Sequence, residues 1–170
     1  MPIDVRDLRG LEGPNIYYGQ PAVKLQLWSD HDIRNEIATT LKTWAQVTGT
    51  VIGYLQQVAQ PENDGFLITT TFTTPFPNVG ERLAEGVVAD LEAAERRDPE
   101  YSHDDILFEV MRQRKREEPS MPLLQIYAEA RARDLPFLAR EDGKITVGSG
   151  ARGFEFDPAG LSLGLGVDVP

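Results

Sequence analysis

The residues best suited to contact a ligand lie in the stretch RGLEGPNIYYGQPAVKLQLW, residues 9–28. Arg9, Asn15, Tyr17 and Tyr18 place a charge, an amide and two aromatic rings in front of an alternating apolar run. Such groups, held on a loop by a rigid strand, are typical of a binding site. The Gly-Pro-Asn in this stretch equally suits a turn, since proline fixes φ and asparagine tolerates left-handed backbone geometry. The pattern therefore predicts either a ligand contact or a turn that directs the chain into its strand.

The two histidines lie at the starts of expected helices, His31 in SDHD and His103 in SHDD. Together with Asp32 and Asp104 they could ligate zinc or iron, since imidazole and carboxylate bind both metals. Serine and aspartate at these positions also cap helix N-termini by accepting hydrogen bonds from free backbone N–H groups. Because the spacing demands no metal, we interpret both motifs as caps and expect no metal site.

A glycine-rich segment, GSGARG at residues 148–153, could surround an anion with backbone N–H groups, with Arg152 beside them. A hairpin loop explains the same glycines. The segment lacks the Gly-x-Ser-x-Gly pattern of a serine hydrolase, and the chain has no Walker lysine-serine pair. We therefore expect no cofactor, while the many carboxylates single out no acid–base pair.

The composition excludes several classes of protein. With no cysteine, the chain can form no disulfide, thiolate zinc site or cysteine nucleophile. Seventeen basic residues against 27 acidic ones give a formal charge of −10, which repels nucleic acid and anionic membranes. The N-terminus has neither the basic start nor the apolar core of a signal peptide, and no apolar run approaches a membrane span. We expect a cytoplasmic protein with no nucleic-acid or membrane partner.

Hydrophobic periodicity predicts the elements that must position these residues. Strands are expected at 3–8, 22–28, 50–58 and 66–74, with AQPENDGF as the connection between the last two, and at 135–139, 144–147 and 154–156 around a turn at 141–143. Helices are expected from Asp32 to Gly49, from Gly80 to Arg97, after the Ser102–Asp105 cap, and from Pro122 to Asp134. This order predicts a single α+β domain, residues 1–170, with a mostly antiparallel sheet and helices packed on one face.

Two of the expected elements make further predictions about exposure. In the strand 66–74, Phe66, Ile68 and Phe72 alternate with threonines, and we expect the threonine face to be exposed, either lining a groove or as ordinary strand residues. In the helix 122–134, the spacing predicts that Leu124, Tyr127 and Ala128 are buried and that Arg131 lies on the flank of this buried face.

Three segments resemble, in order, the N-terminal part of cyanophycin synthetases. LRGLEGPNIYYGQPAVKLQL, residues 8–27, is similar to the family's Leu-Arg-Gly-Pro-Asn opening, its aromatic residue and its Pro-Val before a strand. GERLAEGVVADLEA, residues 80–93, is similar to the Arg-Leu-x-Glu-Gly helix, although the family's histidines are absent from it. Residues 127–156 resemble the segment that leads into the ATP-grasp domain. Residues 1–98 thus resemble the N-terminal domain, and 119–165 the segment preceding ATP-grasp.

The resemblance implies a function without catalysis. Cyanophycin synthetases join Asp and Arg with an ATP-grasp domain and a Mur-ligase-like domain, and neither has a counterpart in this sequence. The resemblance therefore implies a stand-alone relative of the non-catalytic end, which in the synthetases is thought to help hold the growing polymer. It implies a binding or scaffold domain for a peptide-like or small-molecule ligand, acting beside a separately encoded ATP-dependent ligase. The residues of this sequence that match the family's motifs one by one are Arg9, Asn15, Tyr17, Glu85 and Gly86.

Both lines of reasoning give one set of candidate ligand-binding residues: Arg9, Asn15, Tyr17, Tyr18, Glu85 and Arg152. Two alternatives remain open. One is a small enzyme that uses Arg9, Glu85 and nearby carboxylates. The other is a homo-oligomer assembled through the helix faces around Val87 and Val110.

Overall fold

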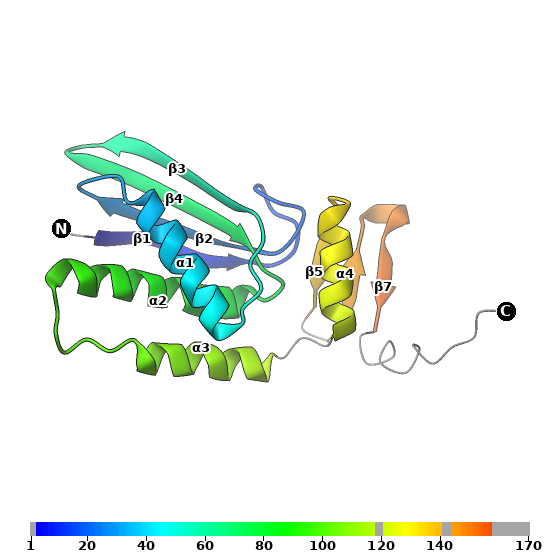
Figure 1. The fold of residues 1–170 in the computed structure, drawn as a ribbon. Helices are drawn as coiled ribbons and strands as arrows, with labels where there is room; N and C mark the ends of the chain where they lie inside the picture. Colours follow the sequence, from blue (N-terminus) through cyan, green and yellow to red (C-terminus); the bar gives the residue numbers. More distant parts are fainter. Residues whose placement is uncertain (1–2, 118–120, 141–143, 158–170) are drawn as a thin grey trace.

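The computed structural model describes residues 3–117, 121–140 and 144–157, and the expected turn at 141–143 lies outside them. The larger sheet has four strands, and Figure 1 shows helices beside it and a smaller unit further along the chain. The elements are β1 (Ile3–Leu11), β2 (Ala22–Ser29), α1 (Arg34–Thr48), β3 (Leu55–Glu62), β4 (Gly65–Thr73), α2 (Pro77–Arg96), α3 (Asp104–Arg116), α4 (Met121–Ala132), β5 (Phe137–Ala139), β6 (Ile145–Val147), the 3-10 helix η1 (Gly150–Arg152) and β7 (Phe154–Phe156).

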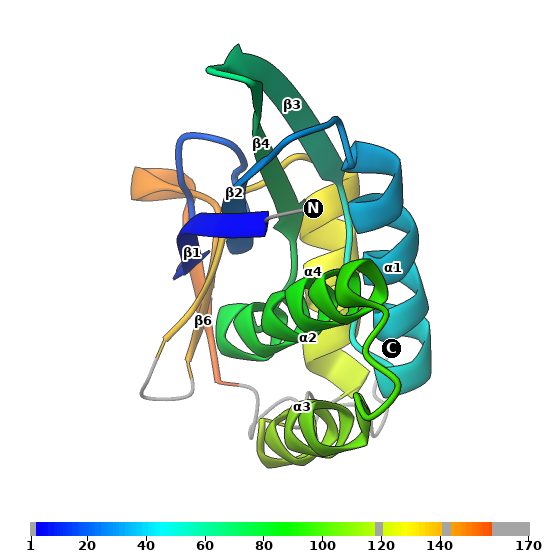
Figure 2. The same cartoon turned by 90° about the vertical axis from the view of Figure 1, so that its left-hand side faces the viewer.

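The larger sheet is antiparallel and has the strand order β1-β2-β4-β3. Val23, Leu25 and Leu27 of β2 are buried in one core with residues of α1 and α2, as their alternation predicts. Figures 1 and 2 show both helices on the same side of this sheet. The predicted α+β class, with antiparallel strands and helices on one face, is confirmed.

Strand β3 begins later than the sequence predicts, at Leu55 in place of Thr50. The residues before it complete the connection from α1. Gly49 ends that helix with a left-handed φ of 66°, and Thr50 N–H donates a hydrogen bond to Ala45 O at 2.9 Å. Thr50 therefore stays with the helix end, whereas Gly53 N–H donates to Thr73 O at 2.7 Å and Thr73 N–H donates to Tyr54 O at 3.1 Å, so residues 53–54 lie beside β4 just before β3 begins.

The hairpin between β3 and β4 is tighter than predicted. Glu62 pairs with Gly65, so only Asn63 and Asp64 form the loop, and Asn63 takes the left-handed φ of 55° that asparagine tolerates. Most of AQPENDGF is therefore strand. Pro61 lies within β3, because β3 is an edge strand that needs no N–H donor on its open side.

Helix α2 begins at Pro77 and not at Gly80. Proline suits the first helical position, since its fixed φ is helical and its missing N–H would have had no intrahelical acceptor there. Gly80 N–H already donates to Phe76 O at 3.0 Å. The TPFPN segment thus starts the helix as well as ending β4.

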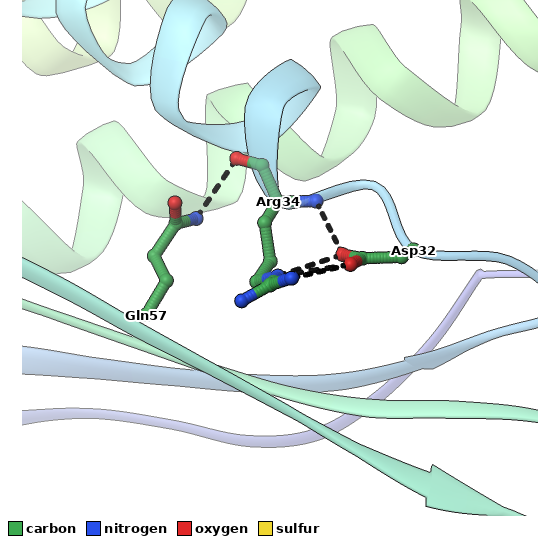
Figure 3. A network of polar contacts seen from close by, with 3 residues as sticks. All are labelled: Asp32, Arg34 and Gln57. Carbon is green, nitrogen blue, oxygen red and sulfur yellow. Dashed lines mark hydrogen bonds and ion pairs between the residues drawn. The ribbon is translucent and has the colours of Figure 1, made fainter.

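The start of α1 is fixed by a polar network that Figure 3 shows. Asp32 accepts hydrogen bonds from the backbone N–H of Arg34 at 3.2 Å and from its guanidinium at 2.6–3.0 Å, and these bonds lower the pKa of the Asp32 carboxyl. Gln57 Nε2 donates to Arg34 O at 3.0 Å and to Thr70 Oγ1 at 3.1 Å. The network ties the first turn of the helix to β3 and β4. Ser29, expected as the cap, lies in β2 instead.

The helices α2 and α3 bury the residues that an oligomer contact was expected to use. Val87 and Val110 are both fully buried in the chain's own core, so these two side chains are not available to a second copy, and assembly through the helix faces around them stays a prediction. The exposed large apolar residues of α3 are Phe108 and Met111.

A second, smaller core joins α4 to the antiparallel sheet β5-β6-β7. The helix buries Leu123, Tyr127 and Ala130 in this core. The predictions for Leu124 and Ala128 are wrong, because the buried row starts one residue earlier and follows the helical spacing i, i+4, i+7. Tyr127 is the one correctly predicted member of that row.

The two cores are connected through the loop at residues 12–21. Gln20, fully buried, donates from Nε2 to Leu135 O at 2.9 Å, and Phe137 N–H donates to Gly19 O at 2.8 Å. Both bonds join the loop to the chain between α4 and β5. The loop is therefore held from two sides.

Helices α1 and α2 meet where Trp44 packs on Gly86. Trp44 Nε1 donates to Asp90 Oδ2 at 2.5 Å, and the Tyr101 hydroxyl donates to Asp90 Oδ1 at 2.8 Å. Burial and the bond to Asp90 raise the pKa of the Tyr101 phenol. The His103 ring meets Trp44 edge-on, with 6.1 Å between ring centroids.

We expect Asp90→Ala to lower the free energy of unfolding by about 2 kcal/mol, because it leaves the indole N–H and the phenol without their charged acceptor. Asp90→Asn keeps one oxygen acceptor, and its free energy of unfolding should fall by about half as much. Urea denaturation followed by tryptophan fluorescence measures both. An Asp90→Ala variant as stable as the parent would show that the carboxylate does not hold the helices together.

Candidate functional site

The sheet face that points away from α1 and α2, called the outer face, carries polar side chains in rows across the strands. Its two central rows, read from β1 to β3, are Arg9–Lys24–Thr71–Gln56 and Asp7–Gln26–Thr69–Val58. Rows on one face of a sheet lie about 7 Å apart along the strands. In the second row Gln26 Nε2 donates to Thr69 Oγ1 at 2.9 Å.

Two tyrosines and an arginine meet at one end of the outer face. The ring of Tyr18 stacks on Tyr54 with 6.3 Å between centroids and an interplanar angle of 16°, and its hydroxyl lies 3.3 Å from Thr71 Oγ1. Arg131 of α4 lies over the Tyr54 ring, with Cζ 5.9 Å from its centroid. Because Tyr54 is 55% exposed, a flat or cationic group of a ligand can reach its ring.

Positive charge is concentrated beside these rings. Lys24 Nζ lies 2.8 Å and Arg9 Nε 3.4 Å from Asp7 Oδ2, so one carboxylate is shared by two cations. Within the described ranges, Arg131 has no carboxylate partner. In a chain of formal charge −10, this end of the outer face is therefore locally cationic.

The threonine face of β4 is only partly exposed, and the prediction for it is wrong at its C-terminal end. Thr71 and Thr73 are 2% and 0% exposed. Tyr18 contacts Thr71 from the loop above the sheet, and Arg131 and Thr73 meet at Gly53. Burial here comes from the loop and from α4, which the strand's own alternation does not reveal.

Asn15 organises the loop that places Tyr18. Its Oδ1 accepts hydrogen bonds from the backbone N–H groups of Tyr17 at 2.9 Å and Tyr18 at 3.0 Å. Its Nδ2 donates to Gly13 O at 3.1 Å and Gln20 O at 2.9 Å. The amide is thus fully used within the loop, which is the turn interpretation of this stretch, and it positions the residue that carries the Tyr18 ring.

The structure brings only some of the predicted site residues together. Arg9 and Tyr18 lie on the outer face, and Tyr17 contributes its backbone N–H to the loop. Glu85 lies elsewhere: it pairs with Arg82 at 2.6 Å and lines a groove of about 760 Å³ between α2 and α3. Arg152 is exposed in η1 of the smaller unit. Arg9 contacts Asp7 and Glu85 contacts Arg82, and the enzyme alternative that uses Arg9 together with Glu85 stays a prediction.

The histidines contact different carboxylates. His31 Nδ1 lies 2.7 Å from Asp30 Oδ1, whereas His103 Nδ1 lies 3.9 Å from Asp90 Oδ1. Among the residues that the structure describes, no group of three or more His, Cys, Asp or Glu is arranged to hold a metal ion. The Ser102 hydroxyl accepts from Asp104 N–H at 3.2 Å, but the residue before α3 is His103, whose side chain makes no capping bond, so the expected Ser102–Asp105 cap is wrong.

Sequence reasoning missed three members of the site: Lys24, Tyr54 and Arg131. Lys24 had a usable signal, because it lies opposite the apolar positions of β2 and directly after the candidate loop. Tyr54 and Arg131 had no such signal in the sequence. They lie 36 and 113 residues after Tyr18 and approach it only through the tertiary fold.

The comparisons with known proteins give one family. The family model described as domain of unknown function (DUF4938) matches residues 2–170. No curated protein matches the chain. In the described part of the chain, no helix has the length and apolar character needed to cross a membrane.

Proposed function

The chain belongs to a family of domains of unknown function, DUF4938, and on that premise we propose that it is a non-catalytic binding domain. It holds a peptide-like ligand across the outer face of its larger sheet. The observation that carries the proposal is the stack of half-buried Tyr18 on exposed Tyr54 beside Arg131, on the sheet face that α1 and α2 leave open.

The spacing of the outer face suits an extended peptide. Side chains on one side of an extended chain repeat about every 7 Å, which is also the spacing of the rows across the sheet. Gln26, Gln56 and Thr69 offer amide and hydroxyl groups in two neighbouring rows. The rings of Tyr18 and Tyr54 offer a flat surface at the end of those rows. A ligand with regularly repeated polar side chains would therefore meet matching groups along its length.

Charge supports a ligand that carries carboxylates. This end of the outer face carries three positive charges, on Arg9, Lys24 and Arg131, and one negative charge, on Asp7. Because the chain as a whole is acidic and repels anions, an anionic ligand is favoured at this end. A guanidinium of the ligand could at the same time stack on the exposed Tyr54 ring. Asp7 is held by two cations, which leaves no free carboxylate in this group to serve as a general base.

The resemblance to the N-terminal domain of cyanophycin synthetases stays part of the proposal. On this view the domain acts in the cytoplasm beside a separate ATP-dependent ligase and holds that enzyme's peptide-like substrate or product. Absence of ATP hydrolysis by the purified chain is the expected result, and turnover of ATP by the chain alone would contradict it.

Isothermal titration tests the binding proposal with an acetylated hexapeptide of alternating aspartate and arginine residues. We expect saturable binding that Tyr54→Ala weakens about tenfold, because the stacking surface is lost. Phe108→Ala is the matched control, since it removes an exposed ring from α3. Absence of binding, or equal losses in the two variants, would contradict the proposal.

A further inference from the structure

Helix α3 presents large apolar side chains to the outside of the molecule. Phe108 and Met111 are 64% and 43% exposed, whereas Val110 of the same helix is fully buried. Both exposed side chains line the groove between α2 and α3. Figures 1 and 2 show α3 on the side of α2 that faces away from the larger sheet, and among the described elements none covers this face of α3. The face is therefore open to a partner.

The exposed face of α3 has the residue spacing of a helix-pairing seam. Its members are Asp104, Phe108, Met111 and Lys115, which follow one another at intervals of four, three and four residues and are all exposed. The same alternation of threes and fours places side chains along one line of a helix, where two paired helices contact each other. These four residues, called the α3 stripe, thus have two apolar side chains in the middle and one charge at each end.

Opposite charges occupy the two ends of α3. The first turn carries Asp104 and Asp105, and the last turn carries Arg114, Lys115 and Arg116. The helix dipole favours this arrangement, but it gives no reason for phenylalanine and methionine on the exposed face between the charges. A partner with charges of one sign would be repelled by one end of the stripe. A second copy of the helix that runs antiparallel meets opposite charges at both ends.

We propose that the α3 stripe packs antiparallel against the α3 stripe of a second copy of this chain, about a two-fold axis. Such symmetry requires that residue i of one copy meets residue j of the other, and that j meets i. With the axis between residues 109 and 110, Asp104 of each copy meets Lys115 of the other. The same axis brings Phe108 of each copy onto Met111 of the other, a favourable pairing of an aromatic ring with a thioether.

The size of the stripe predicts a weak, reversible dimer. A helix of 13 residues is about 20 Å long and about 10 Å wide, so its face covers about 200 Å² in each copy. Arg82 and Glu85 of α2, which line the groove, add to the contact. Stable complexes bury about 800 Å² on each partner. We therefore expect a Kd of about 10–100 µM, with the monomer predominant at low concentration.

Reversal of the end charges tests the antiparallel geometry. Asp104→Lys brings two lysines together at both ends of the paired stripes, and Lys115→Asp brings two aspartates together there. Each single variant should therefore dimerise at least fivefold more weakly than the parent. The double variant with both substitutions restores opposite charges and should regain the parent's Kd. An equimolar mixture of the two single variants restores them as well and should form a mixed dimer with that Kd.

Sedimentation equilibrium at about 50 mM salt, where exposed charges are only weakly screened, measures each of these Kd values. Asp64→Lys is the control for a change of charge alone, since Asp64 is exposed in the loop between β3 and β4. It should leave the Kd within twofold of the parent's. A double variant or a mixture that dimerises no better than the single variants would overturn the proposed pairing.

Removal of the apolar centre tests the contact itself. Phe108→Ala should weaken dimerisation at least tenfold, because the ring packs on Met111 of the other copy. Phe154→Ala is the matched control, since Phe154 is 66% exposed in β7 and lies outside the stripe. The Tm of both variants at low concentration should equal the parent's, because each ring is exposed in the monomer. Equal Kd values for Phe108→Ala and the parent would overturn the proposal.

The dimer and the proposed function fail separately. Hexapeptide binding is measured at low concentration, where the chain is a monomer, and the outer face lies on the other side of the larger sheet from α2 and α3. A parent chain that stays monomeric up to about 1 mM overturns the dimer, even if it binds the peptide. A dimer with the expected charge reversals that binds no peptide keeps this inference and contradicts the proposed function.

Discussion

Replacing Gly86 with alanine should destabilise the protein by about 2 kcal/mol, although alanine is the better helix former by about 1 kcal/mol. A Cβ at this position would lie 2.4 Å from Cη2 and Cζ3 of Trp44, far inside normal contact distance. The indole is buried and held by its hydrogen bond to Asp90, so it cannot move aside without losing that bond. The clash therefore outweighs the gain in helix propensity.

A double-mutant cycle with Trp44→Phe measures this effect. The smaller ring gives the new methyl group room, so Gly86→Ala should cost at least 1 kcal/mol less in the Trp44→Phe background. Urea denaturation followed by circular dichroism gives the four free energies. Equal costs of Gly86→Ala in both backgrounds would show that Trp44 does not pack on this glycine.

Removing the Asn15 side chain should destabilise the protein at least as much as Gly86→Ala. Asn15→Ala deletes four hydrogen bonds inside the loop at residues 12–21, and we expect a loss of about 2–3 kcal/mol. The loop carries Tyr18, so binding of the aspartate–arginine hexapeptide should weaken as well. The two effects arise from one cause, the loss of the amide that shapes the loop.

Asn15→Asp is the graded control for this prediction. It keeps an acceptor for the N–H groups of Tyr17 and Tyr18 and loses the donor to Gly13 and Gln20. Its loss of stability should therefore be smaller than that of Asn15→Ala. Thermal unfolding and peptide titration of both variants test this order, and an alanine variant that retains full stability would contradict it.

The central strand and the first helix could be predicted because their burial is local in origin. Val23, Leu25 and Leu27 alternate, and Ile37 and Leu41 repeat with the helical period, and all five are buried on the predicted sides. Periodicity carries this information whenever one face of an element packs on a single layer.

Element boundaries were harder to predict, since competing local patterns meet there. Thr50 was expected to begin a strand but stays with the end of α1, and Gly80 was expected to begin α2, which in fact begins at Pro77. In α4 the buried row starts at Leu123, one residue before the expected one. Each difference depends on which backbone groups find partners in the folded chain, and the local pattern does not determine this.

The candidate site could be predicted only in part. Arg9, Asn15 and Tyr18 were found because they lie in one stretch with turn chemistry and aromatic residues. Tyr54 and Arg131 reach Tyr18 through pairing of β3 with β4 and through packing of α4 at the end of the sheet. Contacts between segments that lie far apart in the sequence produce no local sequence pattern, so these members of the site can be identified only from the folded structure.

The most direct test of the proposed function is to locate the bound hexapeptide by amide chemical-shift mapping of the labelled protein. We predict that the largest shifts fall on Tyr18, Tyr54 and Arg131 at one end of the outer face. Shifts confined to Phe108 and Met111, in the groove between α2 and α3, would contradict the proposal and assign ligand binding to the other side of the molecule.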